Sequence, residues 1–283
     1  MHILKPISTI TRNLQRVFPQ RPIRGMSRLG NLLTTCLPAY ESVVTMNHGF
    51  KMRLQSAQGA EMGLLLAGMY QPALTHILAQ YSVQSGYYLD IGANLGFFSL
   101  LFASWAGDSG KVASFEVNPQ MVARVQDGKA LNDFDIDIVE KAVHNKAAET
   151  ISFYVSSSAG KSSIYGEQVS DITQQITVET ITIDAYIQQM GWSRVDMIKM
   201  DIEGNDCQGL LGGSQTIRQY QPFIVFEYWR DTSQATTQQA KHLLSDVGYQ
   251  LEILHLNGKR QPFDWHVPNS LHHVDVLCFP PEN

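Results

Sequence analysis

The segment from Asp90 to Gly96, with the sequence DIGANLG, carries residue types that could bind a nucleotide-like ligand. Glycines let the backbone turn sharply and approach a ligand closely, and the N-terminus of a following helix offers free N–H groups. A dinucleotide site would need G-x-G-x-x-G, but Ala93 and Asn94 stand where the middle glycine belongs. Asp90 adds a negative charge that disfavours a pyrophosphate. The segment therefore indicates a ligand with an ammonium group and opposes a nicotinamide-dependent reductase.

A second carboxylate, Glu116, ends the next apolar run after this segment. A carboxylate at the tip of the second strand of an α/β sheet can accept both hydrogen bonds from a ribose diol. Together with Asp90, it indicates a ligand in which a zwitterionic amino acid is attached to a nucleoside, without a 2′-phosphate.

The elements that must position these residues alternate between strands and helices, which predicts right-handed crossovers and a parallel sheet. We expect strands at 87–91, 111–117, 135–143, 196–201 and 223–227, and helices at 95–105, 119–131, about 203–220 and about 233–247. The last two strands, 249–256 and 274–279, have no helix between them, which predicts an antiparallel finish.

The remaining segments predict an extension and a loop. Residues 1–80 are expected to form an N-terminal helical extension with a small hairpin at 43–54 and a helix at 72–81, and residues 81–283 the main domain. Strand pieces at 151–155 and 176–183 flank a loop, 156–165, whose Gly160, Lys161, Ser162 and Ser163 could bind a polyol or cover the site.

These features resemble a known family. The loop 90–96, Glu116 and the segment 198–204, IKMDIEG, together are similar to the FkbM family of class I methyltransferases, over about residues 60–230. Upstream, the segment 68–72, GMYQP, resembles the family's G-x-Y-E-P element, with Gln71 in place of Glu. The resemblance implies S-adenosylmethionine as cofactor and a Rossmann-like α/β fold. In that fold, helices cover both faces of a mostly parallel seven-stranded sheet whose last strand is antiparallel.

The resemblance also implies roles for individual residues. Those surrounding the methionine portion of the cofactor would be Asp90, Gly92, Ala93, Asn94 and Gly96. Glu116 would hold the ribose, and Asn118 would border the adenine together with Lys141, Ala142 and Val143 at the end of the third strand. Asp201 could hold the ammonium group.

Methyl transfer is an in-line displacement that needs an aligned nucleophile and exclusion of water. Asp201 and Glu203 follow the fourth parallel strand, and Glu227 ends the neighbouring strand. The three carboxylates should therefore lie close together at the mouth of one binding site. One of them could act as a general base, with a pKa raised by the others. His144, after the third strand, is a second candidate, and transfer without a base stays open.

A metal is not predicted at these carboxylates. They could bind a divalent cation, but carboxylates at strand tips also serve as helix caps and hydrogen-bond acceptors, as Glu203 could. His272 and His273 have no third ligand at a recognisable spacing, so zinc is not supported.

The resemblance implies O-methylation of a hydroxyl on a sugar, a glycan or a polyketide-like natural product. A methyltransferase acting on protein or nucleic acid is an alternative, and a non-catalytic scaffold or binding protein that retains the fold is another. The N/D-P-P-Y/F tetrapeptide, which would support amino-nitrogen methylation, does not follow the fourth strand.

Charge is distributed unevenly. Residues 1–40 hold six basic residues and no acidic one, at Lys5, Arg12, Arg16, Arg21, Arg24 and Arg28. The rest holds 15 basic and 26 acidic residues, a charge of −11, so we expect no nucleic-acid partner. The N-terminal stretch is also amphipathic, so it could lie on an anionic membrane, or it could pack on the core with its basic face in water.

The cysteines and the apolar runs indicate the compartment. Cys36, Cys207 and Cys278 form no C-x-x-C pair, and reduced thiols fit the cytoplasm. No run of 18 apolar residues predicts a membrane-spanning helix. The expected location is therefore cytoplasmic, with peripheral membrane contact through the N-terminus as an alternative.

Overall fold

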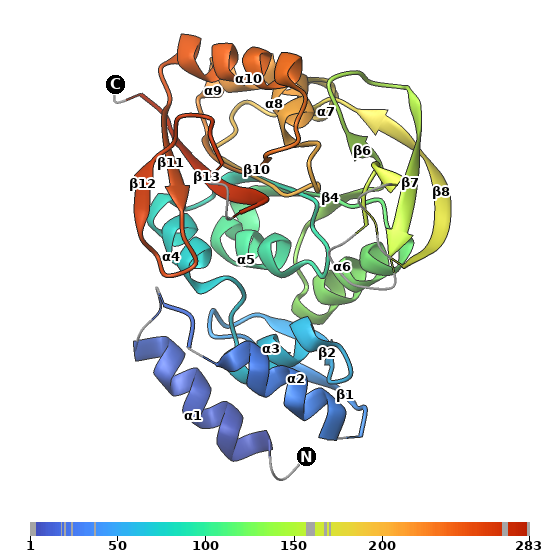
Figure 1. The fold of residues 1–283 in the computed structure, drawn as a ribbon, viewed down its shortest axis with the longest axis vertical. Coiled ribbons are helices and arrows are strands. Elements are labelled where there is room, and N and C mark those ends of the chain that lie inside the picture. The colour runs from blue at the N-terminus through green and yellow to red at the C-terminus, as the bar shows by residue number, and fades with distance from the viewer. Residues whose placement is uncertain are drawn as a thin grey trace.

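The computed structural model of the protein describes residues 4–17, 19, 21–23, 25–36, 38–156, 162–166, 169, 171–267 and 271–281. Its elements stack in layers (Figure 1). The N-terminal elements form one end, followed by the helices α4, α5 and α6, then a large sheet, then the helices α7 to α10.

The large sheet has the strand order β12-β11-β13-β10-β9-β3-β4-β5. The strands are β3 (Tyr87–Ile91), β4 (Lys111–Phe115), β5 (Asp137–Val139), β9 (Met197–Met200), β10 (Phe223–Trp229), β11 (Gln250–Leu254), β12 (Arg260–Pro262) and β13 (His273–Phe279). From β5 through β4, β3 and β9 to β10 the pairing is parallel. The last strand, β13, pairs antiparallel with both β10 and β11. The predicted sheet with an antiparallel last strand is confirmed, and the short β12 adds an edge strand to the seven expected.

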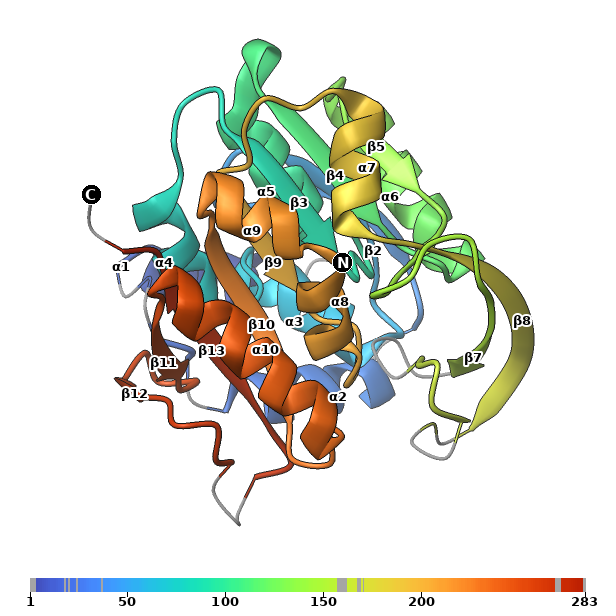
Figure 2. The same ribbon diagram turned by 90° about the horizontal axis from the view of Figure 1, so that it is seen from above.

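Helices cover both faces of this sheet, as predicted (Figures 1 and 2). One face carries α4 (Pro72–Tyr81), α5 (Phe97–Ala106) and α6 (Pro119–Asn132), and the other α7 (Ile183–Met190), α8 (Asp206–Gly212), α9 (Ser214–Tyr220) and α10 (Gln234–Val247). Side chains alternate between the two cores along β3, where Tyr88 packs on the α5 side while Leu89 and Ile91 pack on the other.

Two helical details differ from the sequence prediction. The helix expected to run through to Tyr220 is divided into α8 and α9, and α7 was not predicted. A Cβ on Gly212 would lie 2.2 Å from the carbonyl oxygen of His144, so only glycine fits at the end of α8. Thr182 begins α7 by accepting a hydrogen bond from the backbone N–H of Ala185.

The predicted strand 135–143 is split. β5 ends at Val139, and β6 (Ala142–Val143) pairs instead with β8 (Ile172–Ile181), which pairs antiparallel with β7 (Thr150–Ser156). This separate three-stranded sheet projects from the side of the molecule (Figure 2). Gly160 and Lys161 of the loop expected at 156–165 lie outside the described residues.

The N-terminal segment contains α1 (Leu4–Val17), α2 (Met26–Cys36), β1 (Glu41–Thr45), β2 (Lys51–Gln55) and α3 (Gly59–Ala67). β1 and β2 form the predicted hairpin. Its buried side chains, Met52 and Leu54 among them, belong to the same hydrophobic cluster as Leu100 and Leu101 of α5. Within the described residues no single helix has the length and hydropathy of a membrane span, and only the bent pair formed by 61–67 and 72–81 passes on length and composition.

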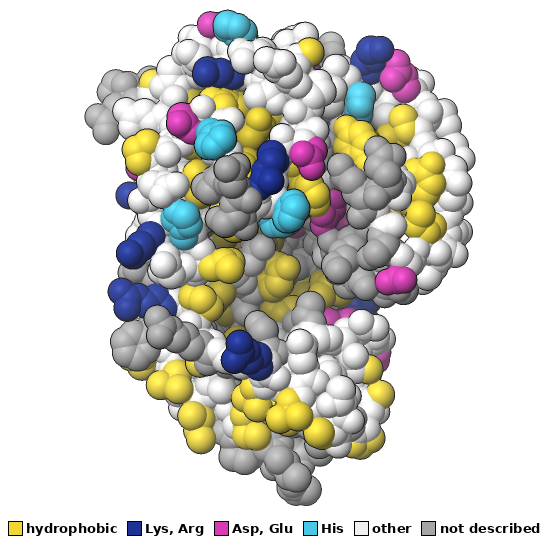
Figure 3. Space-filling model, viewed as in Figure 1, with side chains coloured by type: hydrophobic (Ala, Val, Ile, Leu, Met, Phe, Trp, Pro, Cys, Tyr) yellow, Lys and Arg dark blue, Asp and Glu magenta, His cyan; other side chains and the backbone are white. Residues whose placement is uncertain are grey.

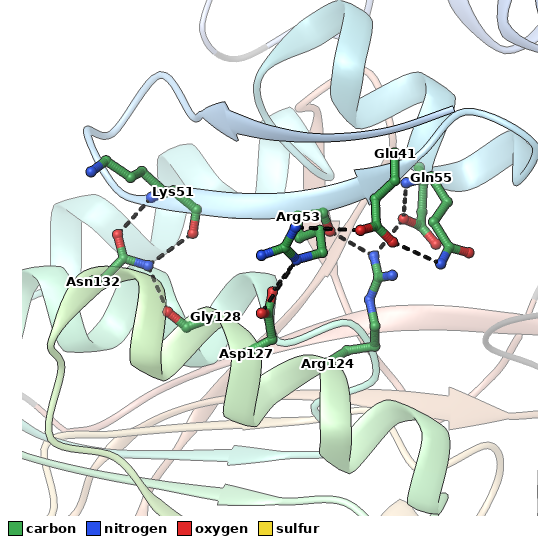
Figure 4. Close-up of polar contacts among 9 residues, drawn as sticks. Glu41, Lys51, Arg53, Gln55, Arg124, Asp127, Gly128 and Asn132 are labelled. Atoms are coloured by element: carbon green, nitrogen blue, oxygen red, sulfur yellow. Dashed lines mark hydrogen bonds and ion pairs between the residues drawn. The ribbon is translucent and has the colours of Figure 1, made fainter. Parts of the chain in front are cut away.

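Polar contacts also join the hairpin to α6 (Figure 4). Asn132 of α6 accepts a hydrogen bond from the N–H of Lys51 at 2.7 Å and donates to its carbonyl oxygen at 2.8 Å. The Nε of Arg53 lies 3.1 Å from a carboxylate oxygen of Asp127. Nearby, Glu61 of α3 accepts hydrogen bonds from the N–H of Gln55 and from Arg124, both at 2.6 Å. The hairpin is therefore anchored to α6 through side chains as well as through the shared core.

Replacing Glu61 by Ala tests this anchor. The Glu61 side chain is 5% exposed and that of Arg124 16%, so the change leaves a largely buried guanidinium without its partner. We expect the free energy of unfolding in urea to fall by about 3 kcal/mol. Glu41→Ala is the control, because Glu41 pairs with Arg53 on the exposed surface and should contribute less than about 1 kcal/mol. Equal losses in the two variants would contradict a buried anchor.

Candidate functional site

A cavity of about 540 Å³ opens at the carboxyl ends of the parallel strands, where ligands bind in open α/β sheets. Its volume lies in the range of small-molecule sites. The loop after β3, the ends of β4, β6, β9 and β10, and the α3–α4 connection all contribute to its wall. Among the described residues no group of three or more His, Cys, Asp or Glu side chains has a metal-binding arrangement.

The loop after β3 is held between two neighbouring strands. The backbone N–H groups of Gly92 and Ala93 donate to the carbonyl oxygen of Phe115 at 2.9 and 3.1 Å. Gly92 has a φ of +78°, and a Cβ there would lie 1.9 Å from the carbonyl oxygen of Asp201. Of the predicted loop residues, Gly92, Ala93 and Asn94 line the cavity. Gly96 does not, but with a φ of +81° it makes the turn into α5.

Glu116 lies in the cavity wall with both carboxylate oxygens engaged. One oxygen accepts from the N–H of Asn94 at 2.7 Å, and the other from Val117 and Asn118 at 2.9 and 2.8 Å. Burial raises the pKa of Glu116, and these hydrogen bonds oppose that rise. Asn118 caps α6 through the N–H of Gln120. The structure thus brings Glu116, Asn118 and Ala142 together along one side of the cavity.

Asp90 lies behind the cavity wall, and its place differs from the one predicted. Its side chain is fully buried, accepts a hydrogen bond from Ser99 at 2.5 Å, and lies 3.6 Å from the Nζ of Lys199, its register partner on β9. Asp90 is therefore not one of the residues that line the cavity. Asp201 does line it, and its carboxylate lies 3.8 Å from the same Nζ of Lys199.

Lys199 itself was not predicted as a site residue. Its Nζ donates to the carbonyl oxygen of Gly92 at 3.2 Å. Burial alone would lower the pKa of Lys199, but the charges of Asp90 and Asp201 outweigh burial, so the pKa is raised. The one sequence signal for it is a lysine inside the otherwise apolar strand MIKM.

The three carboxylates expected to meet, Asp201, Glu203 and Glu227, all line the cavity. Glu227 accepts a hydrogen bond from the indole N–H of Trp229 at 2.5 Å and lies 3.3 Å from His273. Burial, with Asp201 and Asp206, raises the pKa of Glu227 to about 10. A pKa this high means that Glu227 holds a proton at neutral pH.

Two further acids stand behind this wall. Burial and the charge of Asp201 raise the pKa of Asp206 to about 8 and that of Asp275 to about 7. Neither acid was predicted, because Asp275 is remote from Asp201 in the sequence and Asp206 begins α8 instead of following a strand. The carboxylates together make this end of the cavity strongly acidic.

His144, the candidate histidine base, does not line the cavity. The chain turns after β6, and the carbonyl oxygen of His144 faces Gly212 at the end of α8. The histidine that lies in the wall instead is His273, at the start of β13. Burial lowers its pKa, while Asp201 opposes the change.

Two further segments singled out in the sequence, the GMYQP element at 68–72 and the loop at 156–165, also contribute residues to the wall. Leu64, Tyr70 and Gln71 reach the cavity from the α3–α4 region, and Ser162 and Ser163 from the far side. Buried acceptor oxygens of three lining residues, Gln71, Asn94 and Asn205, have no hydrogen-bond partner. Since buried polar atoms are normally paired, these oxygens mark where a ligand can donate N–H or O–H groups.

The sequence from 90 to 251 matches the model of the methyltransferase FkbM domain. The chain belongs to the FkbM methyltransferase family. The matched segment holds the Gly92 loop, Glu116 and the acidic end of the cavity, which confirms the resemblance seen in the sequence. No curated protein matches the chain.

Solved structures show low identity to this FkbM chain. The Methylobacillus flagellatus methyltransferase FkbM is 15% identical, with a TM-score of 0.42 over 78% of this chain and 53% of the other. A protein described as an rRNA methylase from Clostridium thermocellum is 12% identical, with a TM-score of 0.45 over 74% and 94%. Aeropyrum pernix fibrillarin, solved with S-adenosyl-L-methionine, is 12% identical, with a TM-score of 0.42 over 87% and 86%.

The cofactor of the FkbM family is S-adenosylmethionine, as the sequence predicts. The cavity fits it in chemistry. The acidic end suits its ammonium and sulfonium charges, and the unpaired acceptors of Gln71, Asn94 and Asn205 suit its N–H and O–H donors. Apolar side chains near Asn118, those of Phe115, Met121 and Val143, can pack against a flat base.

Replacing Gly92 by Ala tests the close approach of the loop to Asp201. A left-handed φ alone costs an alanine about 1–2 kcal/mol, and here the Cβ would also overlap a backbone oxygen. Gly191→Ala is the matched control, because Gly191 is left-handed with a φ of +60° but no atom lies within 4 Å of the added Cβ. We expect Gly92→Ala to lower the melting temperature more than the control and to abolish cofactor binding. Equal melting temperatures would show that the loop relaxes freely.

Proposed function

We propose that the protein transfers a methyl group from S-adenosylmethionine to a hydroxyl oxygen of a sugar, a glycan or a polyketide-like product. One observation carries the proposal. Residues suited to a nucleoside, Glu116, Asn118 and Ala142, share a single cavity with an acidic end formed by Asp201, Glu203 and Glu227. A bound cofactor and a hydroxyl acceptor can therefore lie next to each other in one cavity.

In this proposal the loop from Gly92 to Asn94 and the carboxylate of Asp201 hold the methionine portion, and Glu116 accepts the ribose hydroxyls. S-adenosylmethionine supplies an electrophilic methyl group on a positively charged sulfur. Asp90 contributes indirectly, because it keeps Lys199 charged and turned toward Gly92 and Asp201. Lys199 in turn fixes the position of the Asp201 carboxylate.

The acceptor binds at the acidic end in this proposal. Carboxylate oxygens accept hydrogen bonds from hydroxyl groups, and the flat face of Trp229 can pack on a sugar ring. An ionised carboxylate of the cluster would take the hydroxyl proton of the acceptor as its oxygen receives the methyl group. His144 takes no part, since it lies outside the wall.

Calorimetry on the purified protein tests the cofactor. We expect S-adenosylmethionine and S-adenosylhomocysteine to bind and NADH not to bind. Glu116→Ala should weaken both by roughly tenfold to a hundredfold, because hydrogen bonds to a charged group contribute about 1.5–3 kcal/mol. The control Glu149→Ala removes an exposed carboxylate paired with Lys146 and should change nothing. If the chain binds neither compound, it is a non-catalytic scaffold. If a labelled methyl group of S-adenosylmethionine passes to protein or RNA but not to sugars, the proposed acceptor class is wrong.

The pH dependence of binding tests the acidic end. Asp275, Asp206 and Glu227 have pKa values of about 7, 8 and 10 and hold protons below those values. A cationic ligand favours their ionised forms, so it must displace protons, and its affinity should rise with pH from below about 7 to about 8, where the α-ammonium group of the ligand begins to lose its own proton. S-adenosylhomocysteine, whose sulfur is uncharged, should show a weaker rise. Calorimetry in buffers of different ionisation enthalpy counts the protons, and identical proton release for both compounds would contradict this account.

A further inference from the structure

The helix α1 faces the molecule with polar side chains and with Ile7, which packs against the core, and it turns a stripe of apolar side chains outward. Thr11 and Gln15 are 8% and 1% exposed, whereas Ile10, Leu14 and Val17 are 61%, 44% and 67% exposed. The three apolar residues recur at intervals of four and three, so they form one stripe along the helix. An ordinary surface helix has the opposite orientation.

Polar contacts explain how α1 stays attached without burying that stripe. Arg12 donates from Nε and Nη2 to the carbonyl oxygen of Leu65 at 3.2 and 2.9 Å, and from Nη1 to that of Thr45 at 2.7 Å. Thr11 donates to the carbonyl oxygen of Leu66. These leucine carbonyls lie in the last turn of α3, where backbone acceptors lack partners within the helix. The side chains of α1 thus cap α3.

The surroundings of the stripe are cationic. Residues 1–40 contain six basic residues and no acidic one. Arg16 at the end of α1, Arg21 after it and Arg28 in α2 are exposed. Leu32 of α2 is also 59% exposed. Figure 3 shows hydrophobic side chains gathered over α1 and α2 at the end of the molecule opposite α10.

We propose that this face, made by Ile10, Leu14 and Val17 of α1 with Leu32 of α2, docks on a membrane that contains anionic lipids. Apolar side chains flanked by cations match an acyl boundary beneath acidic headgroups. A second copy of the chain is a poorer occupant, because it would bring a like-charged N-terminal segment against this one. The proposal does not depend on the proposed function.

The surface lies close to the cavity along the chain. In α3, Leu64 lines the cavity, and the carbonyl oxygens of the next two residues, Leu65 and Leu66, accept hydrogen bonds from side chains of α1. A docked molecule would therefore hold the α3 side of its cavity near the lipid surface.

Sedimentation of the full chain with vesicles tests the proposal. One set of vesicles is phosphatidylcholine alone, and the other contains phosphatidylserine as well. We expect binding only to the anionic set, reduced by high salt because exposed charges are screened. The triple variant Ile10→Gln, Leu14→Gln, Val17→Gln should lose at least about tenfold in partitioning. Its matched control is Ile172→Gln, Met190→Gln, Leu256→Gln, which removes three apolar residues exposed on other elements and should bind like the wild type.

Two measurements keep the outcome decisive. S-adenosylmethionine binding by both triple variants should equal that of the wild type, which shows that the fold is intact and separates this test from that of the proposed function. Binding to neither vesicle, or equal losses in the two triple variants, would overturn the proposal. A second outcome would also overturn it. If the chain binds no vesicles but forms a concentration-dependent dimer in sedimentation equilibrium, and only the α1 variant abolishes that dimer, the face binds a second copy of the chain.

Discussion

The buried ammonium group of Lys199 is the constraint on which the site depends. It lies between Asp90 on β3 and Asp201 after β9 and donates to the carbonyl oxygen of Gly92. A charge removed from water is costly unless it is paired and hydrogen-bonded. The pairing therefore ties β3, β9 and the loop between β3 and α5 to one another, and a slip in strand register would separate the charges. The narrow fit of Gly92 against Asp201 is a second consequence of the same close approach.

The cavity has an excess of acid that this one ammonium group does not neutralise. Asp201, Glu203 and Glu227 line it, and Asp206 and Asp275 stand behind them. Burial, reinforced by the neighbouring charge of Asp201, raises the pKa values of Glu227, Asp206 and Asp275, so protons can relieve the excess. A positively charged ligand relieves it in another way. The charge of the wall therefore suits a positively charged ligand better than an uncharged one.

Much of this was predictable from local sequence patterns. Apolar runs predicted the strands, the Gly92 loop follows from its glycines, and Glu116 and Asp201 directly follow β4 and β9, as expected. Glu227 lines the cavity as expected, but β10 continues past it to Trp229. Other features depend on contacts between distant residues. Asp90 was assigned to the ligand because its partner Lys199 is remote in sequence, His144 lies at a strand end whose chain then turns away, and the split of β5 from β6 depends on β8. For α1, periodicity identifies a stripe but not which side faces the core.

The hydrogen bond between Trp229 and Glu227 gives the protein an optical reporter. Of its four tryptophans, Trp229 lines the cavity, whereas Trp105, Trp192 and Trp265 pack against other aromatic rings. Indole emission responds to the polarity and charge around the ring. Intrinsic fluorescence should therefore follow both the protonation of Glu227 and the filling of the cavity, without a label and in a single cuvette.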